Sequence, residues 1–244
     1  MVEAAQHAVV APATSGATRD ASDPLSYRDR AVDRSFTLGG HVAKVLAVAS
    51  VIFAGGLWLA RDASAWMWSA WPIFWLVANV FEWWIHRFPM HRPLQPRVLY
   101  QAHALIHHRA FVGDAQQIRA TAELSLVMMP WYTLIMVFVM ASPIAGLAAW
   151  LGGPGLAGVF LVASVSYFLL YEAIHTLHHL TAAQLAMIPL GRSHLVAALR
   201  AHHLHHHQRE NMVRVNFNVT FPLADRLMGT YERAPASRSG SPRG

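Results

Sequence analysis

The sequence predicts an all-α, multi-pass membrane protein with four transmembrane helices arranged as two hairpins and a helical cap on the cytosolic side. Three observations lead to this fold class: long uncharged segments, basic residues confined to one side of them, and histidines that gather where the segments end. Of the 244 residues, 55% are hydrophobic and only 13% are charged, whereas a soluble domain typically carries about a quarter of charged residues. This imbalance favours a membrane protein.

Four segments are apolar enough to cross a bilayer, which requires roughly 20 residues per helix. The first two are separated by only Arg61 and Asp62, which predicts a tight hairpin. The second two share an uncharged stretch between Glu123 and Glu172, interrupted by glycines and a proline at residues 152–155. We therefore expect helices near residues 41–60, 63–85, 123–142 and 155–174.

The basic residues predict the orientation, because positively charged loops tend to stay in the cytoplasm. If both hairpins span the membrane, all 19 basic residues except Arg61 lie on one face. Both termini and the histidine-rich segments are then cytoplasmic. Residues 1–35 have no continuous apolar core, and residues 233–244 are similar. We therefore expect a disordered arm and a disordered tail on either side of one membrane domain, residues 36–232.

The composition also limits the chemistry. Because the chain has no cysteine, it forms no disulfide, thiolate-bound zinc site or cysteine-bound cluster, and any metal must be held by His, Asp or Glu. The formal net charge is +6, but the arginines are dispersed among apolar segments and form no basic stripe. We therefore expect no binding to nucleic acid.

Most of the sixteen histidines fall into two clusters, one after each even-numbered apolar helix. The first lies within residues 86–108 and the second within residues 175–207, where residues 202–207 read HHLHHH. Even-numbered helices end on the same face, so the two clusters can meet. Imidazole is the commonest nitrogen ligand for iron, zinc and copper. The number of rings exceeds what one ion can use, so the cap is expected to hold a histidine-ligated site for two metal ions.

The spacing within the clusters supports this interpretation. Side chains three or four residues apart share one face of an α-helix, as His103 and His107 would, and the same spacing recurs in the second cluster. His86 and His91 are five residues apart, but Pro89 between them predicts a bend that turns both rings inward.

Two acidic residues accompany the clusters. Glu82 and Glu172 each stand at the inner end of an apolar helix, shortly before a histidine. Ionisable residues at such a depth usually have a function. We expect each carboxylate to accept an N–H from a ligating ring and so to select its tautomer, and direct ligation is the alternative.

Other histidines are expected to lie outside the metal site. His7, His41 and His194 are interpreted as interfacial polar residues. The rings of residues 202–207 cannot all point the same way, so His202 and His205 are also expected to lie outside it.

Five segments of the chain resemble the fatty acid hydroxylase superfamily, which includes fatty acid 2-hydroxylases, sterol desaturases, sterol methyl oxidases and carotene hydroxylases. They are HRFPMH (86–91), HALIHH (103–108), YEAIHTLHH (171–179), LRAHHLHHH (199–207) and NFNVTFPLADRLMGT (216–230). The resemblance covers roughly residues 40 to 232.

The resemblance implies a dimetal centre, generally di-iron, at the cytoplasmic face of a four-helix membrane anchor, with O₂ as co-substrate. Zinc can occupy such ligands in purified protein. No catalytic residue beyond the metal ligands is expected. The implied ligands are His86, His91, His103, His107, His108, His175, His179, His203, His206 and His207.

The chain departs from the family pattern in three ways. The box at residues 175–179 is one residue shorter than the hydroxylase form, which leaves the choice between His178 and His179 open. In the closing motif, Ala224 stands where the family usually has Trp. There is no fused cytochrome b5 segment, so we expect electrons from a separate protein of the cytochrome b5 or ferredoxin type.

The resemblance implies an oxidoreductase that hydroxylates a C–H bond of a membrane lipid, with a fatty acyl chain as the favoured substrate. Desaturation, or hydroxylation of a sterol or carotenoid, would use the same site and remains an alternative. A histidine-rich metal transporter is an alternative from another class. Transporters place ionisable residues near the bilayer midplane, whereas the predicted helix centres here carry none.

Overall fold

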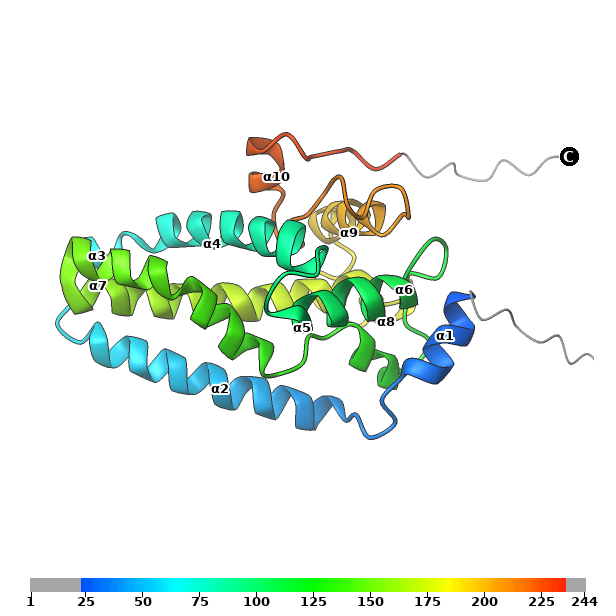
Figure 1. Cartoon of the computed structure of the whole chain (residues 1–244), viewed down its shortest axis with the longest axis horizontal. Helices are drawn as coiled ribbons and strands as arrows, with labels where there is room; N and C mark the ends of the chain where they lie inside the picture. Colours follow the sequence, from blue (N-terminus) through cyan, green and yellow to red (C-terminus); the bar gives the residue numbers. More distant parts are fainter. Residues whose placement is uncertain (1–22, 236–244) are drawn as a thin grey trace, which may run out of the picture.

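The structure, a computed structural model, describes residues 23–235, and every regular element in that range is a helix. Long helices run side by side along the molecule (Figure 1). Their connecting turns and the short helix α3 lie at one end, and most of the other short helices gather towards the other end together with both ends of the described chain. The molecule therefore has an apolar helical half and a cap.

The apolar half consists of α2 (Leu38–Leu59), the short α3 (Ala65–Trp68), α4 (Trp71–Ile85) and α7 (Thr133–His179). The helix α2 begins where the Thr37 side chain accepts a hydrogen bond from the backbone N–H of Gly40 at 3.3 Å. By length and composition, α2 and α7 could each cross a membrane. The predicted helix at 63–85 is present as α3 and α4.

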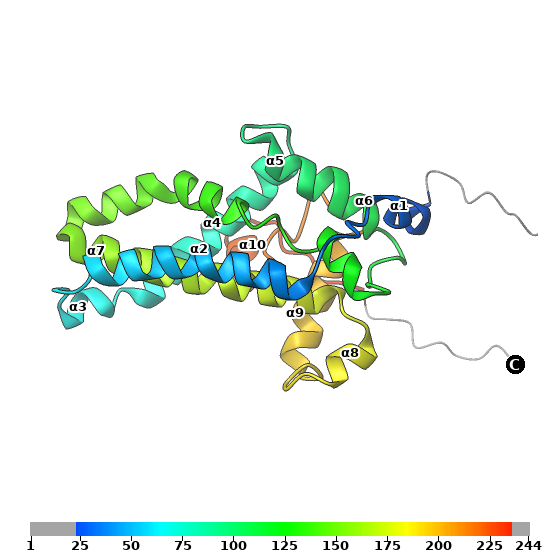
Figure 2. The same ribbon diagram turned by 90° about the horizontal axis from the view of Figure 1, so that it is seen from below.

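The helix α7 bends sharply at Gly152 and Gly153, which have non-helical backbone angles. Gly153 has a φ of 69°, a left-handed conformation that a residue without Cβ adopts readily. The two arms of α7 then run back beside each other (Figure 2), and Ala141 and Ala148 of the first arm share a core with Phe160 of the second. The predicted break at residues 152–155 is therefore confirmed.

Small residues bring α2 close to the second arm of α7. A Cβ on Gly158 would lie 2.5 Å from the backbone of Gly56 and Ala60, so no larger residue fits there. Close approach through small residues is the usual packing of helices in a membrane.

The predicted helix at 123–142 is wrong in its first half. Residues Thr121–Leu126 form the 3₁₀-helix η3, residues 127–132 form no regular helix, and α7 begins only at Thr133. Pro130 explains the interruption, because it disfavours the helical conformation of the residue before it and offers no N–H. The last predicted helix, at 155–174, continues further, to His179.

The cap contains two π-helices that follow α4: η1 (His86–Met90) and η2 (Gln101–His107). The short helices α5 (Arg97–Tyr100) and α6 (His108–Ala110) flank η2. After α7 come α8 (Ala182–Ala186), α9 (His194–His206) and α10 (Leu223–Leu227). The last of these packs on α4 (Figure 1).

The prediction of a disordered arm over residues 1–35 differs from the structure in its last part. Residues Pro24–Ala31 form the helix α1, which the side chain of Asp23 caps by accepting from Ser26 N at 2.8 Å. Arg28 of this helix is fully buried, because it binds groups far away in the sequence, which no local pattern reveals. Residues 1–22 and 236–244 lie outside the described residues.

Candidate metal centre

Ten histidines meet in the cap and form two groups of five, with each ring offering one nitrogen. Within each group, the offered nitrogens lie within 4.8 Å of one another. These are the ten residues for which the sequence predicted metal ligation. Group A comprises His86, His91, His103, His108 and His206, and group B comprises His107, His175, His179, His203 and His207.

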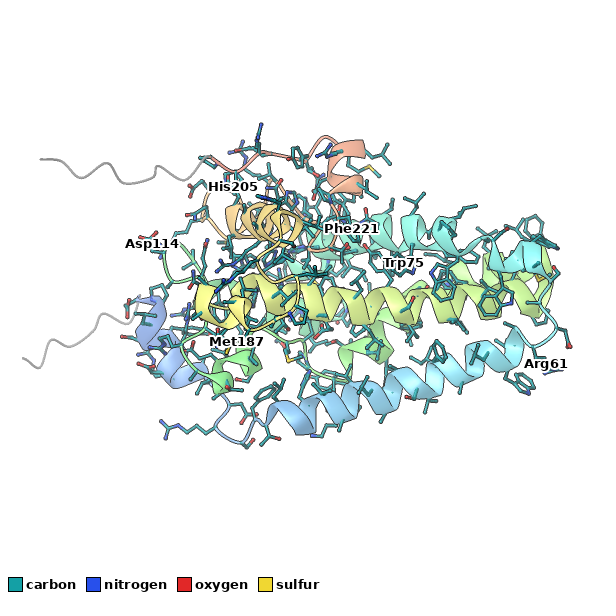
Figure 3. The ribbon with its side chains drawn as sticks, turned by 180° about the vertical axis from the view of Figure 1, so that it is seen from behind. Arg61, Trp75, Asp114, Met187, His205 and Phe221 are labelled. Atoms are coloured by element: carbon teal, nitrogen blue, oxygen red, sulfur yellow. The ribbon has the colours of Figure 1, made fainter. Side chains whose placement is uncertain are left out.

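Both groups lie in the cap, away from the turns of the apolar half. Figure 3 shows His205, which belongs to α9 between ring-bearing residues of both groups, at the end of the molecule opposite Arg61. All ten rings are buried except His91, which is half-buried.

The π-helices decide which rings share a group. A π-helix joins residues five apart, and His86 and His91, which flank η1 in this register, both belong to group A. In the same way η2 brings His103 and His108 into group A, while His107 turns into group B. The predicted α-helical pairing of His103 with His107 is therefore wrong.

In α7 and α9 the α-helical spacing holds. His175 and His179 lie in group B, as do His203 and His207, and each pair is four residues apart. His206, three residues after His203, belongs to group A, so these two residues do not share a group although their spacing predicted a common face. The helix α9 thus supplies both groups.

Neighbouring Nε2 atoms are close in both groups. In group A the distances are 2.8 Å (His86–His103), 2.9 Å (His103–His108), 3.2 Å (His108–His206) and 3.2 Å (His91–His206). In group B they are 3.0 Å (His203–His207), 3.2 Å (His107–His207), 3.2 Å (His107–His175) and 3.3 Å (His179–His203). Two nitrogens at right angles around one ion, each about 2.0–2.1 Å from it, would be about 3 Å apart. The geometry therefore fits rings arranged around a common ion.

The tautomers also call for a cation. His107 donates its Nδ1–H to Leu126 O at 2.9 Å, and His207 donates its own to Phe111 O at 2.6 Å. In a neutral ring of this tautomer, Nε2 carries a lone pair and no proton. The two Nε2 atoms nevertheless face each other at 3.2 Å, and two lone pairs at this distance repel unless a positive ion lies between them.

Protonation does not remove this conflict at neutral pH. Burial lowers the pKa of His107 to about 4, and it lowers the pKa of His206 in group A to the same level. Both rings are therefore neutral at pH 7 and present lone pairs, which is the form that binds metal.

Backbone carbonyls orient the rings by binding their Nδ1 atoms, whereas the prediction assigned this role to carboxylates. Five of the ten rings place Nδ1 against a main-chain oxygen, an arrangement that selects the metal-binding tautomer. The ring and carbonyl pairs are His86 with Phe217, His206 with Val215, His107 with Leu126, His179 with Gln116 and His207 with Phe111. The Nδ1 atoms of His103, His108 and His203 are buried and have no hydrogen-bond partner among the described residues.

Glu82 binds no ring, so the predicted contact is wrong. Its carboxylate accepts from the backbone N–H groups of Val219 and Thr220, and from the hydroxyls of Thr220 and Tyr167. It thereby holds the segment whose Phe217 carbonyl orients His86. Glu82 acts on group A through the backbone of residues 217–220.

Glu172 binds no ring either. One of its carboxylate oxygens is buried and has no hydrogen-bond partner among the described residues. The residue follows Tyr171, whose ring lies 5.7 Å from that of His175, and whose hydroxyl is also buried without a partner among the described residues. The predicted contact to a ring is thus absent for both acidic residues within residues 23–235.

The remaining histidines lie outside the two groups. His178 places Nε2 2.9 Å from Val219 O instead of facing another ring nitrogen, so His179 is the member of group B. His202 faces Asp225 at 3.1 Å and His205 faces Glu232 at 3.0 Å. His41 packs against Phe36, His194 is exposed, and His7 lies outside the described residues.

Sequence reasoning missed three residues that support the site. Asp225 is fully buried and accepts from the backbone N–H groups of Phe217 and Asn218. Asn79 bonds to the same C-terminal segment through Phe221 O and Ala224 N. Arg28 binds the last residue of α6 and the loop after it. A signal existed for Asn79, because an amide inside an apolar helix three residues before Glu82 requires polar partners.

An apolar cavity of about 80 Å³ lies between α4 and both arms of α7. It extends along apolar side chains such as Val77 and Phe160 to Met90 and His86, and His86 is the one metal-group histidine in its lining. Its polar lining also includes the hydroxyls of Ser164 and Tyr171, which have no hydrogen-bond partner among the described residues. The cavity therefore reaches group A.

Two larger apolar hollows adjoin this cavity. One, of about 510 Å³, lies between α2 and α7 and shares Phe138 and Phe160 with the cavity lining. The other, of about 500 Å³, lies between α4 and α7 and shares Phe81 and Ile144 with it. The cavity and the two outer hollows are thus neighbours that share lining side chains.

The fold and the two groups define a class: helical proteins that gather histidines for metal binding at the end of long apolar helices. A family model for fatty acid hydroxylases matches residues 71–230. The chain therefore belongs to the fatty acid hydroxylase family, and this membership makes it an oxidoreductase. Comparison with curated proteins and with solved structures gave no match.

Proposed function

We propose that this protein is an O₂-dependent, membrane-bound di-iron oxygenase that hydroxylates a C–H bond of a lipid, with a fatty acyl chain as its substrate. Group A and group B would each hold one ion through the ten histidines. When bound, the two ions would supply the activation of O₂ and the oxidation of an unactivated C–H bond. The chain's own residues would bind the substrate and orient its C–H bond.

The observation that carries this proposal is the apolar cavity that ends at His86. Its lining is predominantly apolar and offers van der Waals contact along its length, which suits a hydrocarbon chain. A volume of about 80 Å³ is well below the roughly 300–1,000 Å³ of pockets for drug-sized ligands. The cavity therefore favours a slender chain segment over a rigid ring system.

The outer hollows support lateral access from the bilayer. Both are lined almost entirely by apolar side chains, and rotation of Phe138 or Phe81 would join one of them to the cavity. Four membrane spans are proposed on the same grounds: α2, α4 with α3, and the two arms of α7. The cap, with both termini, would then lie in the cytoplasm, as the distribution of arginines favours.

The reaction requires two electrons from outside the chain. One oxygen atom of O₂ enters the C–H bond as a hydroxyl, and the other leaves as water with two electrons and two protons. We propose that a separate protein of the cytochrome b5 or ferredoxin type delivers these electrons to the cytoplasmic cap.

The test is lipid profiling of cells with and without this chain, followed by labelling with ¹⁸O₂. A new hydroxylated acyl lipid that carries one ¹⁸O atom supports the proposal. A product labelled only from H₂¹⁸O would exclude a monooxygenase, and a product with a new double bond and no label would identify a desaturase. The matched control is the double variant His103→Ala/His206→Ala, which should yield no product.

A further inference from the structure

One segment of the cap orients most of group B. Residues 110–126, here called the strap, connect α6 to the end of η3 and contain no regular element between α6 and Thr121. Three of the five group B rings donate Nδ1–H to its main-chain oxygens. The pairs are His207 with Phe111 (2.6 Å), His179 with Gln116 (2.7 Å) and His107 with Leu126 (2.9 Å). The two group A rings with a carbonyl partner, His86 and His206, bond to residues 217 and 215 instead.

A loop of this kind holds its carbonyls in place only if other groups bind it. Two ties come from the helices of the metal centre: Ile118 N donates to His179 O at 2.9 Å, and the Gln116 side chain donates to Leu204 O at 2.8 Å. Further ties come from α1, at the beginning of the described chain.

Arg28 of α1 is the main tie. Its side chain is 0% exposed, and its guanidinium donates to Ala110 O at 2.6 Å, to Gln117 O at 2.7 Å and to the Glu123 carboxylate at 3.2 Å. The same guanidinium lies over the ring of Phe111, 4.1 Å from its centre. Arg28 thus bonds to the residue before Phe111, to the residue after Gln116, and to the 3₁₀-helix that ends in Leu126.

A second arginine completes this network. Arg119 bonds to the Glu123 carboxylate through its backbone N–H at 2.8 Å and its side chain at 2.6 Å, and to Asp29 of α1 at 2.7 Å. Glu123 therefore joins α1, the middle of the strap and η3 at a single buried carboxylate. The Glu123 carboxylate pairs with the charge of Arg28, and this matters because leaving a charge unpaired inside a protein is costly. The Nη2 atom of Arg28 is buried and has no hydrogen-bond partner among the described residues.

We propose that Arg28 is a positioning residue for the group B metal site. It acts through the strap: by binding three points of this segment, it holds the carbonyls that select the tautomer and direction of His207, His179 and His107. The inference rests on the proposed function only in taking group B as a metal site. Since α1 precedes the apolar helices, an N-terminal helix outside the predicted membrane domain would tune one of two metal sites.

The test measures zinc affinity by competition with a chelator, using the full chain in detergent micelles. The background His103→Ala/His206→Ala leaves group B complete, and the background His179→Ala/His207→Ala leaves group A complete, so the tighter binding step reports the intact group. In the first background, Arg28→Gln should weaken zinc binding about 10-fold, the lower end of what loss of a ring-orienting partner causes. In the second, the affinity should change less than about 2-fold, because the carbonyls that orient group A lie outside the strap.

The conservative variant separates positioning from folding. Arg28→Lys keeps the charge but cannot reach two carbonyls and a carboxylate with one planar fork, so its zinc affinity should lie between that of the unchanged chain and that of the Arg28→Gln variant. Equal weakening in both backgrounds would mean general destabilisation and would overturn the inference. No weakening in either background would also overturn it. Loss of tight zinc binding from both backgrounds before Arg28 is changed would instead refute the ligand groups themselves.

Discussion

Group A and group B are built alike in their rings and differently in the segments that orient these rings. Each has five rings, with neighbouring nitrogens about a hydrogen-bond length apart. Behind group A, the carbonyls of Val215 and Phe217 lie in the segment after α9. Glu82 and Asn79 tie this segment to α4. Behind group B, the carbonyls lie in the strap, which α1 holds.

Because of this difference, we expect changes in different parts of the molecule to affect the two groups. Group A is coupled to an apolar helix that also lines the cavity, and its His86 borders that cavity. Group B is fully buried and has no residue in the cavity lining. Changes around the cavity should therefore affect group A first, and changes in α1 should affect group B first.

Removing two rings from either group is expected to have the largest effect. His103→Ala/His206→Ala and His179→Ala/His207→Ala should each lower lipid-modifying activity by more than about 100-fold, because loss of direct ligands exceeds the 10–100-fold typical of outer partners. Each purified variant should retain about one ion instead of two, measured by elemental analysis. Full activity in either variant would show that one group suffices and would break the comparison.

Filling the cavity should separate substrate binding from metal binding. Ala141 lines the cavity and is buried, whereas Ala149 on the same arm of α7 is exposed and lines neither the cavity nor the outer hollows. We expect Ala141→Phe to lower kcat/KM for an acyl substrate about 10-fold, the equivalent of about 1.4 kcal/mol, within the usual cost of overpacking. The metal content should stay at two ions. Ala149→Phe is the matched control, and an equal loss of activity in it would show that the cavity is not the binding site.

Glu82→Gln should mirror the Arg28 experiment on the other group. In the His179→Ala/His207→Ala background, we expect zinc binding to group A to weaken about 10-fold, because the amide cannot accept from all four donors that the carboxylate binds. In the His103→Ala/His206→Ala background, the affinity of group B should be unchanged. Weakening of both groups would mean that the two outer shells are not independent.

Acid should destabilise the metal-free chain through both groups alike. The folded pKa values of His107 and His206 are lowered to about 4, so the unfolded chain binds protons below about pH 6.5 while the folded rings stay neutral. The free energy of unfolding is therefore highest above pH 6.5. As the pH falls from 6.5 towards 4, it decreases by about 1.4 kcal/mol per pH unit for each ring.

Unfolding free energies in mixed micelles, measured between pH 4 and 6.5, would check this slope. The variants His107→Gln and His206→Gln should each reduce the slope of unfolding free energy against pH by the contribution of one ring, about 1.4 kcal/mol per pH unit. Identical slopes in the variants and the unchanged chain would contradict the low pKa values.

Part of the site followed from the sequence because it depends on local spacing and composition. The absence of cysteine left histidine as the main ligand type, and the pairs His175 with His179 and His203 with His207 obey α-helical spacing in the structure. The sequence also predicted the helix break at residues 152–155, since glycine and proline interrupt helices through their own backbone chemistry.

The spacing of the histidines in the sequence did not predict how the rings divide between group A and group B. His103 lies four residues from His107 and five from His108, and an α-helix would pair the first two, whereas the π-helix η2 pairs His103 with His108. The choice between α- and π-helix depends on packing against the rest of the cap. The predicted ring contact of Glu82 was wrong for a related reason. Its carboxylate accepts hydrogen bonds from the backbone of residues 219 and 220, more than a hundred positions away in the sequence.

The sequence by itself determined that this chain has long apolar helices with histidine clusters at their ends, because hydrophobicity and ligand chemistry are properties of the residues. The tertiary structure alone decided which five rings gather in each group, which carbonyls orient them and which group meets the cavity. These outcomes depend on contacts between distant segments, such as Arg28 with the strap and Glu82 with residues 219–220. The free energy of such contacts comes from burial and hydrogen bonding in three dimensions, which no local pattern encodes.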